Sequence, residues 1–355
     1  MNCCIDCFYD SQIRSTIELQ RNFGDCDFCD SKNIAVIDVD DPLNPISEKI
    51  IELLQLYSAS TTAEAKPLKI ALRDDWDIFT AGAETLLALT KKLCANVYDI
   101  DAEIYSKNVI IEKLTDKDFL REYGIVRGYS WDEFSESIKY GNRFHSGMFN
   151  SKQFISFIDM VINGYPAGMK MYRARICPDK KGYSKDDMNA PPKDKRTAGR
   201  INPEGIGVLY LSSDKLTILN EVRASAFDHI SIGTFQAVRD IRTVNLSGFD
   251  KTSPFKYDSD LAGFAANRKV FKELAAEVAR PLRRSDSNLE YLPTQYITEF
   301  IKSQNFDGVV YDSTLRQGGY NLAIFNDDLF ECVKVQTIEV SEILYKTQPE
   351  ILAGG

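Results

Sequence analysis

Arginine, carboxylate and hydroxyl side chains occur in separate segments of the second half of the chain. Arg173 and Arg175 lie in an apolar stretch, Arg200 lies in a glycine-rich loop, and Glu221 and Ser313 follow. Guanidinium groups offer a rigid fork of donors that matches phosphate oxygens. A carboxylate can stabilise positive charge that develops on a neighbouring atom. These residue types suit a substrate that carries phosphate groups and becomes cationic as it reacts.

Glu221 is the first candidate for this carboxylate. Residues 212–214 are Ser-Ser-Asp, which are common at helix starts, so Glu221 is expected about two turns into a helix over 214–227. Ile218 and Val222 lie on or beside the apolar stripe of that helix. We therefore expect Glu221 at the edge of the stripe, while the alternative is an ordinary solvated glutamate.

The arginines are candidates for binding phosphate groups. Arg173 lies inside an expected strand, where an unpaired charge is costly, so it requires an anion from the protein or from a ligand. Arg175 lies two residues further along the same expected strand, so its side chain projects to the same face as that of Arg173 and could take this role instead. Arg200 follows Gly199 in a loop where the backbone can approach a ligand closely. A structural ion pair is the alternative for Arg173 and Arg200.

Two further side chains could contact a ligand. Tyr210 ends an expected strand, and its ring could stack on an aromatic group or fill the core. Ser313 follows Tyr311 and Asp312 at a strand end, where a serine can bind a ligand or form a turn.

Together these segments resemble the RES domain family over roughly the last half of the chain. The resemblance rests on linked motifs in one order, which are more specific than any single pattern. They are Met171–Arg175, Gly199–Leu211 with Glu221, Asp307–Ser313 and Gly318–Phe325. Members of this family consume NAD and are named for an arginine, a glutamate and a serine. The resemblance implies catalytic roles for Arg173, Glu221 and Ser313. It implies NAD-binding roles for Arg200, Tyr210, Asn321 and Arg175.

NAD breaks most readily between ribose and nicotinamide, because nicotinamide leaves as a neutral molecule. The remaining sugar is similar to the oxocarbenium centre of glycoside cleavage. Such a site needs phosphate anchors, an aromatic face and one carboxylate, but no histidine. The chain has 2 histidines, which argues against a histidine triad or a histidine-bound metal. It lacks a P-loop and a full dinucleotide fingerprint, so NAD is expected as a substrate rather than as a redox cofactor.

The resemblance implies an enzyme that cleaves NAD as a glycohydrolase or phosphorylase and acts as a toxin or defence effector by depleting cellular NAD. One alternative is an ADP-ribosyltransferase that modifies a macromolecular target, and another is a non-enzymatic binding protein. The acceptor stays open among water, phosphate and a macromolecule, because loops outside the NAD site select it. Toxin members of the family imply a neutralising or regulatory protein partner. Short members are little more than this domain, whereas residues 1–165 precede it here and could regulate the site instead.

A separate cysteine pattern lies near the beginning of the chain. Cys4 and Cys7 form one C-x2-C pair, and Cys26 and Cys29 form a second. Two such pairs supply the four thiolates of a tetrahedral, structural zinc site, which leaves no open position for catalysis. Cys3 could replace Cys4 as a ligand. The alternative is a set of thiols without a metal.

The coarse pattern predicts an α+β protein in three parts. A zinc-binding module is expected over 1–35, a helical domain over 36–165, and a RES-like domain with a mixed sheet over 166–355; the resemblance implies an ADP-ribosyltransferase-like fold for the last part. Helical spacing marks residues 50–57, 86–97, 131–138 and 154–161, and further helices are expected over 214–227, 260–278 and 293–303. Strands are expected over 169–177, 207–211, 240–246, 308–312, 322–325 and 332–336.

Composition is that of a globular protein with a sizeable core. The chain has 355 residues, 44% of them hydrophobic, and a net charge of -9. This acidic balance argues against a general nucleic-acid or anionic-membrane surface. No secretory leader pattern and no apolar run of bilayer length is found. We therefore expect a cytoplasmic protein without a membrane partner, and we expect a homo-oligomer.

Overall fold

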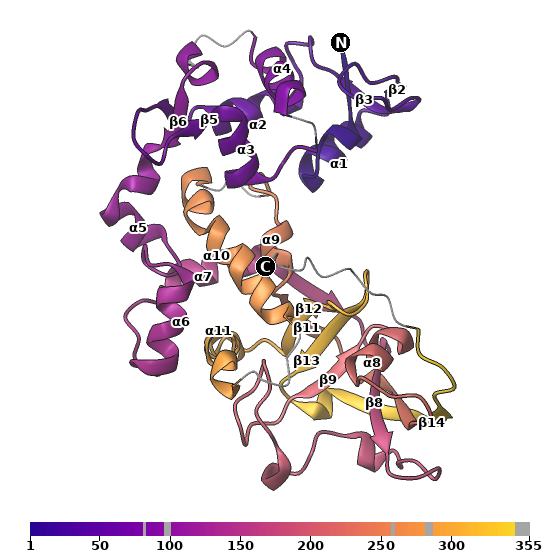
Figure 1. Cartoon of the computed structure of the whole chain (residues 1–355). Helices are drawn as coiled ribbons and strands as arrows, with labels where there is room; N and C mark the ends of the chain where they lie inside the picture. The colour runs from indigo at the N-terminus through magenta and orange to yellow at the C-terminus, as the bar shows by residue number, and fades with distance from the viewer. Residues whose placement is uncertain (81–82, 96–100, 257–259, 281–286, 345–355) are drawn as a thin grey trace, which may run out of the picture. The chain divides into compact units, whose positions relative to one another are not determined.

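The structure of the protein is a computed structural model (Figure 1). It describes residues 1–80, 83–95, 101–256, 260–280 and 287–344. The chain forms two compact units. The first unit comprises Met1–Val161 and Gly248–Ala276, and the second comprises Ile162–Ser247 and Glu277–Gly355. The three-part division into 1–35, 36–165 and 166–355 stays a prediction.

A mixed eight-stranded sheet forms the centre of the second unit, in the order β14–β10–β8–β9–β13–β12–β11–β7. Strands β11 and β12 pair parallel, and the other neighbours pair antiparallel. The strands are β7 (Ile162–Tyr165), β8 (Lys170–Cys177), β9 (Leu209–Ser212), β10 (His229–Ala237), β11 (Ile241–Asn245), β12 (Gly308–Asp312), β13 (Tyr320–Ile324) and β14 (Phe330–Glu339). The helices of this unit include α8 (Lys215–Glu221) and α11 (Leu292–Ser303). The protein is thus α+β with a C-terminal mixed sheet, as predicted.

The two faces of this sheet carry separate apolar clusters, because side chains alternate along each strand. On one face, Leu209 and Leu211 of β9 belong to a buried cluster with Met171 of β8. On the opposite face, Ala174 of β8 packs with Ile218 of α8. Helix α8 therefore covers the face that the even-numbered residues of β8 and β9 share.

Strand register sets a row of polar side chains on the α8 face. Asn321 of β13 pairs with Ser212 of β9 on one side and with Tyr311 of β12 on the other. Ser212 also pairs with Tyr172 of β8. Paired residues project to the same face, so these side chains form a continuous row across four strands.

The first unit contains two small sheets, ordered β1–β3–β2 and β4–β6–β5. Their strands are β1 (Asn2–Cys4), β2 (Phe23–Gly24), β3 (Ile34–Asp38), β4 (Tyr57–Ala59), β5 (Lys66–Pro67) and β6 (Asn108–Ile111). The helices are α1 (Ser11–Leu19), α2 (Pro45–Leu54), α3 (Leu68–Trp76), α4 (Ala83–Leu93), α5 (Lys117–Tyr123), α6 (Trp131–Tyr140), α7 (Ser151–Ile158), α9 (Gly248–Lys251) and α10 (Leu261–Ala279). The last three residues of α10 belong to the second unit.

Aromatic packing and one buried amide hold α10 in the first unit. The Phe271 ring meets the Phe157 ring edge-on at 5.0 Å and lies 6.0 Å from that of Phe264. The fully buried Asn267 accepts from the backbone N–H of Ile125 at 2.6 Å and donates to the carbonyl of Tyr123 at 2.8 Å.

Several elements differ from the sequence-based expectation. The sequence did not predict β10, nor the short strands β4 to β6 within the segment expected to be helical. The helix expected over 214–227 ends at Glu221. The predicted N-cap of α6 is confirmed, since Ser130 and Glu133 form a reciprocal capping box. Val97, which was expected at the end of a helical stripe, lies outside the described residues. No described helix has the length and apolar content that crossing a bilayer requires.

Candidate functional site

Glu221 is held by hydrogen bonds from two strand ends. Ser313 Oγ donates to Glu221 Oε1 at 2.7 Å, and Asn321 Nδ2 donates to the same oxygen at 2.9 Å. Asn321 in turn accepts from Ser212 Oγ at 2.6 Å. Glu221 is the last residue of α8, where the helix dipole disfavours a carboxylate. The bonds from Ser313 and Asn321 offset this cost and fix the carboxylate in place.

Helix α8 is anchored at its other end by Asp214. The Asp214 carboxylate caps the helix by accepting from the backbone N–H groups of Leu216 and Thr217 at 3.0 and 3.1 Å. It also accepts from Thr217 Oγ1 at 2.7 Å and pairs with Arg316. Burial raises the pKa of Asp214, but these bonds to Thr217, Ser213 and Arg316 outweigh it and lower that pKa to about 2. The helix that presents Glu221 thus begins at an ionised cap.

Buried polar side chains of α11 fix the backbone around Arg200. Thr294 Oγ1 donates to the carbonyl of Arg200 at 2.8 Å, and Thr298 Oγ1 donates to that of Ile201 at 2.8 Å. Gln295 Nε2 donates to the carbonyl of Gly199 at 2.7 Å. All three side chains are buried, so water cannot compete for these carbonyls. The loop is therefore held in one conformation against the helix.

The Arg200 side chain is 13% exposed and already has protein partners. Its Nη1 donates to the backbone carbonyl of Glu277 and lies 3.5 Å from Glu277 Oε1. The Tyr291 ring centroid lies 5.3 Å from the guanidinium carbon. Burial lowers the pKa of Arg200, and the Glu277 carboxylate partly offsets this effect.

Tyr210 has a defined hydroxyl partner. Its hydroxyl donates to Asn202 Oδ1 at 2.7 Å, and Asn202 Nδ2 donates to the carbonyls of Thr197 and Ile206 at 3.0 and 2.9 Å. Burial raises the pKa of Tyr210, so the hydroxyl stays protonated and acts as a donor. The ring, rather than the hydroxyl, is thus the part of Tyr210 that can meet a ligand.

Two cavities meet at Glu221. The larger, of about 340 Å³, is lined by Ala198, Gly199, Arg200, Tyr210, Glu221, Arg223, Val278, Ala279, Arg280, Tyr291, Tyr311, Asp312, Thr314, Leu315 and Asn321. The smaller, of about 270 Å³, is lined by Arg173, Ala174, Tyr210, Leu211, Ser212, Ile218, Glu221, Val222, Tyr311 and Asn321. Both volumes lie near the lower end of the range for small-molecule sites. Four residues border both cavities: Tyr210, Glu221, Tyr311 and Asn321.

The structure does not bring the guanidinium groups of β8 to Glu221. Arg173 and Arg175 alternate with Ala174, whose side chain faces α8, so their side chains leave the sheet on the opposite face. Arg173 Nη1 donates to the carbonyl of Met188 at 3.1 Å, and Arg175 Nη2 donates to that of Asn189 at 2.8 Å. Burial, together with the adjacent Arg175, lowers the pKa of Arg173 to about 10. Arg173 still lines the smaller cavity, although its partly buried guanidinium group lies on the other face of the sheet and donates to a neutral carbonyl.

Sequence reasoning assigned no role to several residues that line the larger cavity. Arg223 and Arg280 add two guanidinium groups beside Arg200, and Tyr291 and Tyr311 add aromatic rings. Arg223 adopts a left-handed backbone conformation with φ 50°, which is uncommon outside glycine. Its position two residues after Glu221 was the one available signal. Arg280 and Tyr291 lie in segments without a recognisable motif.

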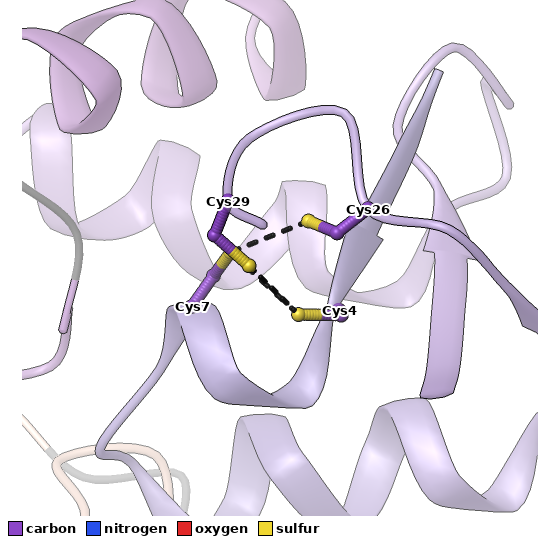
Figure 2. A group of neighbouring side chains, drawn as sticks. All are labelled: Cys4, Cys7, Cys26 and Cys29. Atoms are coloured by element: carbon purple, nitrogen blue, oxygen red, sulfur yellow. Dashed lines mark hydrogen bonds between the residues drawn. The ribbon is translucent and has the colours of Figure 1, made fainter. Parts of the chain in front are cut away.

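The four predicted metal ligands of the first unit converge. Figure 2 shows the sulfur atoms of Cys4, Cys7, Cys26 and Cys29 directed toward one another. Their Sγ atoms all lie within 4.8 Å of one another, with closest pairs at 3.4 and 3.6 Å. Tetrahedral sulfur ligands with Zn–S bonds of about 2.3 Å lie roughly 3.8 Å apart, so the cluster could hold a metal ion. Cys3 is not part of this group, and its Sγ lies 3.9 Å from the carbonyl of Cys4.

The second unit therefore combines a mixed sheet with a cavity that is lined by three arginines and by the hydrogen-bonded carboxylate of Glu221. Residues 170–343 match the family model of the RES domain, so this segment of the chain is a RES domain. The chain is also similar to a structure titled as the crystal structure of the M. tuberculosis MbcT–MbcA toxin–antitoxin complex, with 13% identity and a TM-score of 0.33 over 53% of this chain and 92% of that chain. The identity and the TM-score are both too low for any property of that complex to be assigned to this chain. No curated protein matches the chain.

Proposed function

We propose that the RES domain binds NAD in the two adjoining cavities and cleaves the bond between nicotinamide and ribose. The observation that carries this proposal is the position of Glu221, a carboxylate held by Ser313 and Asn321 where the cavities meet. The match of the segment to the RES domain supports the same substrate.

Glu221 would stabilise the reacting sugar. The bond between ribose C1′ and nitrogen breaks, and its electron pair passes to the pyridinium nitrogen, so nicotinamide leaves neutral. Positive charge then grows on the ribose, where a neighbouring carboxylate is favourable. Both hydrogen bonds reach Oε1, so Oε2 is, among the described residues, the oxygen open to a ribose hydroxyl or to the proton of the acceptor. Water as acceptor yields ADP-ribose, and phosphate yields its 1″-phosphate.

The larger cavity suits the diphosphate of NAD. Arg200, Arg223 and Arg280 line it, and guanidinium groups match phosphate oxygens in charge and geometry. Tyr210 and Tyr311 border both cavities, so either ring could stack on nicotinamide beside Glu221. This arrangement supports a substrate that extends through both cavities, with its scissile bond at Glu221.

The test is product analysis after incubation of the full chain with NAD, with and without phosphate. The wild type is expected to release nicotinamide, and Glu221→Gln is expected to lower the rate about 100-fold or more, because it keeps the shape but removes the charge. Glu299→Gln, on the exposed side of α11, is the matched control and should retain the rate. Absence of nicotinamide release by the wild type, or an equal rate for Glu221→Gln, contradicts the proposal.

A transferase that passes ADP-ribose to a macromolecule is the second candidate, since it uses the same first step. NAD labelled in its adenylate part separates the two. Label in free ADP-ribose or its phosphate supports cleavage, whereas label retained on protein or nucleic acid supports transfer. A non-enzymatic binding protein is the third candidate, and the absence of NAD binding in a calorimetric titration would favour it.

The cellular role that we propose is a toxin or defence effector that depletes NAD, with a protein partner that neutralises or regulates it. The support is the match to the RES domain together with the consumption of NAD that the sequence resemblance implies. We further propose that the protein acts in the cytoplasm as a homo-oligomer, which sedimentation of the purified chain would test.

We propose that the cysteine cluster binds one structural Zn²⁺. Four thiolates are the donor set that zinc prefers in closed sites, and three of the four side chains are buried. When bound, the ion would join the end of β1 to the loop before β3 and supply no chemistry to the NAD site.

A further inference from the structure

Glu277 places a carboxylate between two arginines of the larger cavity. Its Oε1 lies 3.5 Å from Arg200 Nη1, and its Oε2 lies 3.8 Å from Arg280 Nη1. The three residues that follow Glu277 at the end of α10 line the cavity themselves. One protein carboxylate thus partly neutralises two of the guanidinium groups that a ligand phosphate would use.

The contacts of Arg200 differ in strength. The backbone carbonyl of Glu277 accepts from Nη1 at the C-terminal end of α10, where the helix dipole attracts a cation. The Tyr291 ring supports the guanidinium at 5.3 Å. The two carboxylate contacts are longer than the 2.7–2.9 Å typical of charge-assisted hydrogen bonds. The carbonyl and the ring can therefore hold Arg200 without the carboxylate.

We propose that the Glu277 carboxylate is a resident counter-ion that competes with ligand phosphate for Arg200 and Arg280, and so limits the affinity of the site for its substrate. This inference rests on the proposed function. A diphosphate can bond both arginines at shorter distances than the carboxylate does, and Arg200 keeps its position through the carbonyl of Glu277. The side chain of Glu277 is 20% exposed, so the displaced carboxylate can turn toward water at small cost.

The decisive experiment is calorimetric titration of the full chain with ADP-ribose, which carries the diphosphate but cannot undergo the reaction. Glu277→Gln keeps the backbone carbonyl and nearly the same shape but removes the charge. It is expected to lower the Kd for ADP-ribose about fivefold, the scale of a partly exposed ion pair. The KM for NAD should fall by a similar factor, with a smaller change in kcat. Glu277→Asp, which keeps the charge on a shorter side chain, should give an intermediate Kd.

Glu299→Gln removes one charge elsewhere in the same unit and should leave the Kd unchanged. If the wild type binds ADP-ribose and Glu277→Gln binds it equally or more weakly, the inference is wrong, and weaker binding would identify Glu277 as a residue that positions Arg200. If the wild type binds neither ADP-ribose nor pyrophosphate, the proposed function fails and the inference fails with it. Thermal unfolding of each variant verifies that the compared proteins are folded.

Discussion

At the scale of single residues, the site depends on how Glu221 is oriented. Ser212 donates to Asn321, and Asn321 and Ser313 each donate to the same oxygen of the Glu221 carboxylate. All three are buried, so their bonds are not exchanged with water. A carboxylate fixed in this way loses little orientational entropy when a ligand arrives, which is the condition for efficient charge stabilisation.

Arg173 allows function and stability to be separated. Its partly buried guanidinium is bonded to a neutral carbonyl, and a charge that is removed from water in this way costs folding free energy unless an anion compensates it. Arg173→Met is therefore expected to leave the Tm unchanged or raise it. If the role implied by the resemblance holds, NAD cleavage falls about tenfold or more. Thermal unfolding and nicotinamide release measure the two effects.

Arg175→Met is the matched control for this prediction. Arg175 is partly exposed, donates to the carbonyl of Asn189 and lies 5.9 Å from the Tyr183 ring. We expect a smaller loss of activity than for Arg173→Met. A lower Tm with full activity in Arg173→Met would instead give Arg173 a purely structural role in holding the segment around Met188.

At the scale of elements, the N-cap of α8 links helix stability to the site. Asp214→Ala removes both the cap and the ion pair with Arg316, and is expected to cost about 1 kcal/mol of unfolding free energy. Asp214→Asn keeps a good capping acceptor and should cost less. Urea unfolding at pH 7 compares the variants, and NAD cleavage should fall in Asp214→Ala because α8 carries Glu221. Equal stability of all three proteins would contradict the capping role.

This contribution has a defined pH dependence. The pKa of Asp214 in the folded protein is about 2, below the ordinary value of 3.8, so the stabilisation is present above pH 3.8 and is lost as the pH falls toward 2. The stability difference between the wild type and Asp214→Ala is accordingly expected to shrink over this interval. Urea unfolding of both proteins at several pH values in that range tests whether the stability difference decreases as the pH falls.

Elements with a clear hydrophobic periodicity or a helix-capping motif could be predicted from the sequence, and others could not. The capping box of α6 and the apolar strands β8 and β12 were evident from the sequence. Strand β10 was missed because Gly233 interrupts it and because Ser231 places a polar side chain at a fully buried position. Ser231 is tolerated there because Cys177 and Thr337 lie within hydrogen-bonding distance at 3.1 and 3.0 Å. These hydrogen-bonding partners come from strands that are distant in sequence, so they cannot be predicted without the structure of the sheet.

Contacts between residues that are distant in sequence also determine the candidate site. Glu221, Ser313 and Asn321 were identified through the resemblance, but their mutual bonding depends on the register of β9, β13 and β12. Glu277 could not be predicted at all, because its proximity to Arg200 depends on where α10 ends relative to a distant loop. The functional roles of all these residues, Arg173 and Arg175 included, stay predictions.

At the scale of the whole molecule, metal binding can be tested apart from NAD chemistry. The purified chain is expected to contain one Zn²⁺, and Cys26→Ser is expected to lose it, with a lower Tm for the first unit. Cys3→Ser should retain the metal, since Cys3 lies outside the cluster. Elemental analysis and thermal unfolding provide the readouts. Metal retained in Cys26→Ser, or lost in Cys3→Ser, would contradict the assigned ligand set.

The chain passes from the first unit to the second and back before it ends in the second. Residues 248–276 therefore belong structurally with the N-terminal half, although they lie within the segment that matches the RES domain. A fragment that starts at residue 162 would uncover the Phe264 and Phe271 rings and strip Asn267 of its partners at Tyr123 and Ile125. The borders of the matched family segment are thus unsuitable for truncating this polypeptide, and expression of that segment alone would first require a redesigned surface on α10.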